Sequence, residues 1–185
     1  MNKTGHSGIN TMFRLRSLTH EYLNEAMLYL EKIKKMDSNK EFWKYNLYCK
    51  NIIIYSFFSV ENYIKRLIIN EINNSTFTDS KIIFETLFNN PNFKLNIIVV
   101  IPLLFGTEID RTNHTWGQIN ELRKWRNKIV HCVPGEGYEY EKEILTLKNC
   151  QNAIKFAKNF IKYLANLAGT DPPKIISQSK YEEII

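Results

Sequence analysis

The residues best suited to chemistry in this sequence are a cation, an amide and an imidazole that lie close together: Arg126, Asn127 and His131. Arginine can hold a phosphate group through two parallel hydrogen bonds. Histidine titrates near neutral pH, so it can give or take a proton under cellular conditions. Because RNA supplies its own nucleophile, the 2′-hydroxyl group, such a site could cut RNA without a metal ion.

These side chains can meet if the segment is helical. Residues four apart lie about 40° from each other around an α-helix, so Asn127 shares a face with His131 and with Arg123. Arg126 lies roughly 140° from His131, but its long side chain can bend toward that face. We therefore predict Arg126, Asn127 and His131 as catalytic residues. Basic residues on the same helix are predicted to contact RNA, namely Arg123, Lys124 and Lys128.

An arginine followed after four residues by a histidine, with an asparagine directly after the arginine, resembles the motif of HEPN domains. Residues 56–67 also resemble an earlier helix of that family, in which Glu61 takes the place of an acid that faces the motif. The resemblance covers about residues 12–167. It implies a metal-independent endoribonuclease, in which Glu61 positions Arg126 or His131.

The same resemblance implies partners. The expected assembly is a homodimer whose two motifs face each other across one cleft, with RNA as the substrate. A role as a toxin or in antiphage defence is implied, together with an antitoxin or another regulatory protein.

Other interpretations of these residues remain open. A second match to the motif runs from Arg14 to His20, but it lies inside a predicted helix and has no following asparagine. His131 could serve only as a cation at a helix C-terminus. Glu61 could simply pair with Lys65, four residues later on the same helix.

The elements expected around these residues are helices. Apolar residues recur at three- and four-residue steps, and residues 52–60 are apolar nearly all round, as in a buried central helix. Residues 95–105 fit a strand or a short buried helix, and the surrounding pattern favours the helix. We predict an all-α, HEPN-like antiparallel bundle of about five helices, with helical segments at residues 12–36, 40–72, 79–88, 114–130 and 147–167.

We expect a single domain over residues 12–168, preceded by a flexible N-terminus of residues 1–11. A charged loop is predicted at residues 136–143. The last helix should end at Gly169, because glycine is favoured just after a helix C-terminus. It cannot continue through Pro172–Pro173, because proline has no backbone N–H to donate. Residues 169–185 then form a C-terminal tail, and its residues 175–185 are expected to be disordered or docked on a partner.

Composition narrows the function classes. The net charge of +6 permits contact with a polyanion. Three widely spaced cysteines fit reduced thiols in the cytoplasm. The longest apolar run has roughly nine residues, too few to span a bilayer, so no membrane association is expected. The phosphate-binding, dinucleotide-binding, zinc-protease and serine-hydrolase motifs are absent, and we expect neither a metal nor a cofactor.

Two alternatives to a ribonuclease stay open. The first is a non-catalytic HEPN-like module for dimerisation or partner binding, suggested by the lack of a long basic run. The second is a helical protein that binds nucleic acid without cutting it.

Overall fold

The structure, a computed structural model, describes residues 7–74, 92–131 and 139–177, and every regular element in these ranges is helical. The prediction of an all-α fold is therefore confirmed. The bundle is built from four long helices in this part of the chain, α1 (Ser7–Lys34), α2 (Phe42–Asn74), α6 (His114–Val130) and α8 (Leu147–Leu167). Shorter helical segments complete it: α4 (Phe93–Leu95), η1 (Asn96–Val100), α5 (Ile101–Phe105), α7 (Glu139–Ile144) and α9 (Lys174–Ser177).

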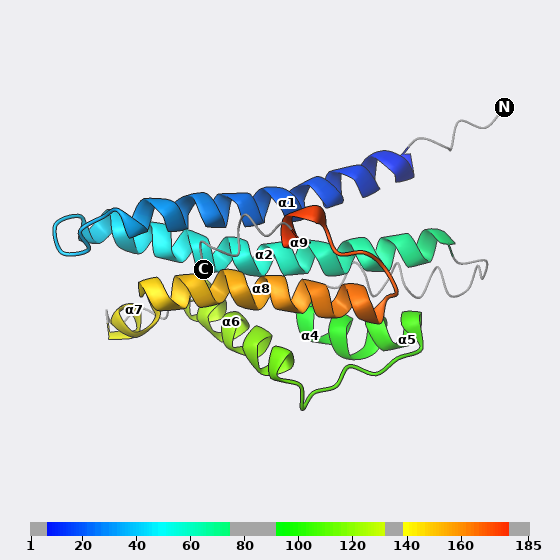
Figure 1. Cartoon of the computed structure of the whole chain (residues 1–185). Helices are drawn as coiled ribbons and strands as arrows, with labels where there is room; N and C mark the ends of the chain where they lie inside the picture. Colours follow the sequence, from blue (N-terminus) through cyan, green and yellow to red (C-terminus); the bar gives the residue numbers. More distant parts are fainter. Residues whose placement is uncertain (1–6, 75–91, 132–138, 178–185) are drawn as a thin grey trace.

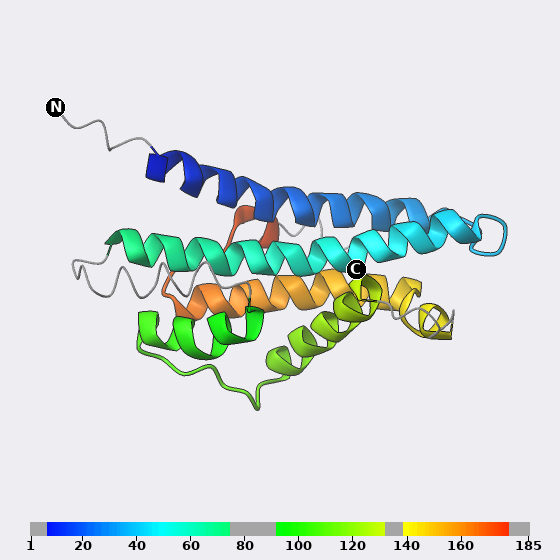
Figure 2. The ribbon, with the colours of Figure 1, turned by 180° about the vertical axis from the view of Figure 1, so that it is seen from behind.

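Helices α1 and α2 form an antiparallel hairpin along one side of the bundle (Figure 1). The Asp37 side chain shapes the turn between them, because its Oδ1 accepts hydrogen bonds from the backbone N–H groups of Asn39 (3.0 Å) and Lys40 (3.4 Å). Aromatic side chains join the two helices, and the rings of Tyr29 and Tyr48 lie 5.0 Å apart. Seen from behind, α6 and the α4–α5 segment lie on the side of the bundle opposite α1 (Figure 2).

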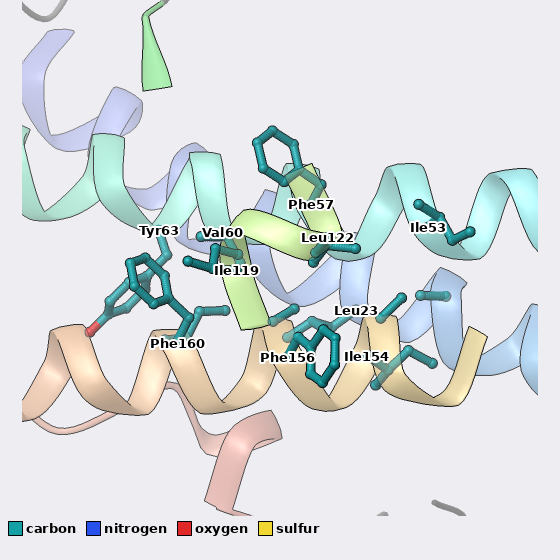
Figure 3. Packing of buried hydrophobic residues seen from close by; sticks show 14 of the residues in the cluster. Leu23, Ile53, Phe57, Val60, Tyr63, Ile119, Leu122, Ile154, Phe156 and Phe160 are labelled. Atoms are coloured by element: carbon teal, nitrogen blue, oxygen red, sulfur yellow. The ribbon is translucent and has the colours of Figure 1, made fainter. Parts of the chain in front are cut away.

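The core lies between α2, α8, α1 and α6. The middle of α2 is buried as its all-apolar pattern predicts, and α8 presents one continuous apolar face to it. Burial of each large apolar side chain contributes about 1.5–3 kcal/mol to stability. The residues that meet at this centre are shown in Figure 3, among them Phe57, Val60, Tyr63, Ile119, Leu122, Ile154, Phe156 and Phe160.

The boundaries of α6 and α8 follow their sequence signals. The Asn113 side chain accepts a hydrogen bond from the N–H of Thr115 and starts α6. Thr146 caps α8 in the same way through the N–H of Asn149. Gly169, with φ of 61°, follows the end of α8 in the left-handed conformation that favours glycine.

Residues 93–105 are helical rather than extended, as the surrounding pattern favoured. The helix widens over η1, where the N–H of Ile101 bonds to the carbonyl of Asn96, five residues earlier. Pro102 explains the widening, because it has no N–H to donate and its ring crowds the carbonyl four residues before it.

Several predicted boundaries differ from those in the structure. Helix α1 begins at Ser7, inside the segment expected to be a flexible N-terminus. Part of the predicted charged loop is the short helix α7, because glutamate and lysine are good helix formers even when they are exposed. The predicted helix at residues 79–88 lies outside the described residues.

The beginning of the C-terminal tail also differs from its prediction. Ile175 and Ile176 are each 1% exposed, and α9 packs on α8 of the same chain. These two residues are therefore neither disordered nor reserved for a partner. Residues 178–185 lie outside the described part.

Candidate functional site

Helix α6 carries the predicted site, and its packing fixes which side chains can reach one another. Leu122 and Trp125 face the core, and the Trp125 ring stacks on Phe156 of α8 with 5.8 Å between ring centroids. With these two residues inward, Arg126 falls at the edge of α6 that borders α2. Asn127 and Lys128 point to solvent.

The guanidinium group of Arg126 rests on aromatic rings of α2. Its central carbon lies 5.6 Å from the ring centroid of Phe57 and 5.9 Å from that of Phe58. Its Nη1 donates a hydrogen bond of 3.1 Å to Oδ1 of Asn127. Its Nε is buried and has no hydrogen-bond partner in the described part of the chain. The cation is thus held in place but still has donor capacity for an anion.

Glu61 lies one turn further along α2 than these rings, and it is half-buried. Burial raises the pKa of its carboxyl group, while the nearby charges of Arg126 and Lys65 oppose that rise. Glu61 is therefore close enough to Arg126 for the charges of the two side chains to interact. Among the described residues, however, the two do not approach within ion-pair distance. The role of Glu61 in positioning the motif, which the resemblance implies, stays a prediction.

His131 ends α6 as its C-cap residue, with φ of −111° and ψ of 36°, and its side chain is exposed. Its backbone N–H donates to the carbonyl of Asn127 at 2.9 Å. Within the described residues, no hydrogen bond joins its ring to Arg126. The side-chain interactions of the described residues therefore link Arg126 to Asn127 and to the charge of Glu61, and they do not include the His131 ring.

The three predicted RNA-contacting residues do not form one group. Arg123 is half-buried, and its Nε is buried with no hydrogen-bond partner among the described residues. Lys124 and Lys128 are exposed. Lys128 lies about 160° from Arg126 around the helix axis, so the two cations occupy different faces of α6.

The competing motif match also has a place in the structure. His20 is exposed on α1, far along the chain from α6, and no described contact gives it a neighbour suited to chemistry.

The two rings beneath Arg126 were not anticipated as part of the site. Their position three and four residues before Glu61 is the signal that could have found them, because such residues share a helix face.

The described residues show no group of three histidine, cysteine or acidic side chains that could hold a metal ion. In the same ranges, each helix is too short or too polar to cross a bilayer.

A family model described as RiboL-PSP-HEPN matches residues 27–169 of this chain. The matched span begins within α1 and ends at the glycine after α8, so it includes α2, α6 and the candidate site that they carry. No curated protein shows significant similarity to the chain, and no solved structure does.

Proposed function

The chain belongs to the RiboL-PSP-HEPN family, a family of HEPN domains, and from this membership and the surroundings of Arg126 we propose that it is a metal-independent endoribonuclease. The observation that carries the proposal is the set of contacts made by the Arg126 guanidinium group. Its guanidinium is held by Asn127 and two rings, yet its buried Nε has no hydrogen-bond partner in the described part of the chain. Because the residue is only half-buried and bonds to no carboxylate among the described residues, the other N–H groups of the guanidinium can bond a phosphate.

In the proposed reaction, the 2′-oxygen of RNA forms a bond to the adjacent phosphorus and the bond from phosphorus to the 5′-oxygen breaks. A base takes the proton of the 2′-hydroxyl, an acid protonates the leaving 5′-oxygen, and the products are a 2′,3′-cyclic phosphate and a 5′-hydroxyl. Arg126 holds the phosphate and stabilises the charge of the transition state. His131 acts as the acid or the base.

A homodimer would complete the proposed site. Two protomers whose α6 ends face each other bring two His131 side chains to one cleft, one as base and one as acid. Asn127 orients the arginine or the phosphate, and Glu61 positions Arg126 from α2. Arg123, Lys124 and Lys128 add positive charge for RNA. We place this activity in a cytoplasmic toxin or antiphage defence effector that an antitoxin or another regulatory protein restrains.

Incubation of the purified full chain with labelled RNA in EDTA tests the proposal. Wild type is expected to cut, and His131→Ala should be slower by about 10²- to 10⁴-fold, the usual contribution of a general acid or base. His20→Ala is the matched control, because it removes an exposed histidine of the competing motif match, and it should cut like wild type. Absence of cleavage by wild type, or equal cleavage by His131→Ala, would refute the mechanism.

One observation favours the alternative of a non-catalytic partner-binding module. Large apolar side chains are exposed at the start of α2, where Trp43 is 71% and Leu47 54% exposed. Growth of cells that overexpress the chain separates the two functions. Toxicity that requires both Arg126 and His131 supports the ribonuclease, whereas a tight complex with a second protein and no toxicity supports the module.

A further inference from the structure

A cavity of about 580 Å³ lies beside the first half of α6, away from Arg126. The segment before α6 contributes Arg111, α6 contributes His114 and Gln118, and α8 contributes Asn152 and Lys155. Its volume is in the range of sites that hold a nucleotide-sized ligand. Figure 2 shows that α6 runs obliquely to α8.

The helical period extends this cavity into a longer feature. His114, Lys124 and Lys128 lie within about 80° of one another around α6. Lys148 and Lys155 likewise lie within about 20° of each other on α8. We define the α6–α8 groove by its cavity residues and the lysines that continue it: Arg111, His114, Gln118, Lys124, Lys128, Lys148 and Lys155.

The groove is positively charged. Its arginine and four lysines are all exposed, and none of them takes part in an ion pair within the described part of the chain. Glu121 is the one acidic residue among those that line the cavity. Unpaired cations along a groove are what a chain of phosphates requires.

The floor of the cavity is a fixed hydrogen-bond network. Gln118 is only 8% exposed, and its Oε1 accepts a hydrogen bond of 3.2 Å from Nδ2 of Asn159. Its Nε2 must then donate to Nε2 of His114, which lies 2.9 Å away. Neutral His114 accordingly carries its proton on Nδ1, and this N–H is left as a hydrogen-bond donor at the edge of the cavity.

We propose that the α6–α8 groove binds the phosphodiester backbone of single-stranded RNA, with one phosphate between Arg111, His114 and Lys155. An arginine fork and a lysine point charge suit phosphate oxygens. The one aromatic residue among those that line the cavity, Phe156, is covered by Trp125 and offers no ring face to a base. The groove therefore contributes affinity without sequence preference. Only the choice of RNA as the ligand rests on the proposed function, because Arg111, His114 and Lys155 have no part in the proposed ribonuclease site.

The salt dependence of binding tests this groove. The full chain carrying His131→Ala is titrated against a short fluorescein-labelled single-stranded RNA between about 50 and 200 mM KCl, and anisotropy gives Kd. Each lost phosphate contact lowers the slope of log Kd against log salt concentration by about 0.7 for a single strand. Adding Arg111→Ala and Lys155→Ala removes both cations from that one phosphate and should thus lower the slope by about 0.7.

The control pair is Lys40→Ala with Lys94→Ala, which removes the same charge from exposed positions outside the groove. It should leave the slope unchanged, and far-ultraviolet circular dichroism should show that both double variants fold. An equal effect of the two pairs, or no binding at all, overturns the groove. If wild type fails to cut RNA while the groove pair still lowers the slope, the ribonuclease proposal falls and the groove stands. If wild type cuts but the slope does not change, the groove alone is wrong.

Discussion

Arg126 is held by the residue that follows it, because its Nη1 donates a hydrogen bond of 3.1 Å to Oδ1 of Asn127. The rings of Phe57 and Phe58 lie against the same guanidinium. A planar cation held by an amide and two rings keeps its orientation without an ion-pair partner that a phosphate would have to displace. This geometry leads to the first prediction.

Arg126→Lys should be almost as inactive in RNA cleavage as Arg126→Ala. Lysine keeps the charge but has neither the planar fork nor a flat face to stack on a ring. We expect a loss of about 100-fold or more in the single-turnover rate for both variants, comparable to the removal of a transition-state donor. Near-wild-type cleavage by Arg126→Lys would mean that charge alone is needed and that the orientation of the guanidinium is irrelevant.

Glu61 should make the protein less stable as the pH rises. Because burial raises the pKa of Glu61, the folded state holds this proton more tightly than the unfolded state does. The free energy of unfolding should therefore fall as the pH rises from the ordinary glutamate pKa, about 4.3, through the raised value. In Glu61→Gln this decrease should be missing. Urea unfolding of both proteins across this range measures it, and identical pH profiles would contradict the prediction.

Ile176→Ala should destabilise the fold although it lies in the segment after the last long helix. The side chain is 1% exposed, and truncation of a buried isoleucine costs about 2–5 kcal/mol. Leu103→Ala is the control, because Leu103 is 63% exposed and should change the free energy of unfolding by less than about 0.5 kcal/mol. Urea unfolding gives both values. Equal stability of the two variants would show that α9 does not dock.

Cys49 and Cys150 should resist thiol reagents in the folded protein. Both are free and fully buried. A hydrogen bond with Cys49 and burial raise the pKa of the Cys150 thiol, which disfavours the reactive thiolate. In a Cys132→Ser background, Ellman's reagent should label neither thiol until denaturant is added. Rapid labelling without denaturant would argue against this packing of α2 on α8.

The helices could be predicted where local signals are strong. The caps Asn113 and Thr146 mark the starts of α6 and α8, and their apolar periodicity marks the buried faces. Residues 95–105 could not be assigned by period because the apolar run is short, and only the tertiary structure shows the widened turn before Pro102.

Some features of the candidate site could likewise be predicted from the sequence, and others could not. The helical period already separates Arg126 from Lys128, so their different faces could have been foreseen. The rings beneath Arg126 share a helix face with Glu61, so their place near the site could have been foreseen as well. Their contact with Arg126 could not, because it joins α2 to α6 and depends on how the two helices cross. The hydrogen-bond network of His114, Gln118 and Asn159 could not be predicted either. Gln118 and Asn159 are 41 residues apart in the sequence, and no local pattern predicts their contact.

Helix α9 has a practical consequence for any shortened version of this protein. The family match ends at residue 169, whereas Ile175 and Ile176 lie beyond it and are buried. A fragment cut at the family boundary would uncover the apolar surface that these side chains protect. Newly exposed apolar patches promote aggregation. The stable unit for expression and crystallisation therefore extends at least through α9, past the limit that family similarity would suggest.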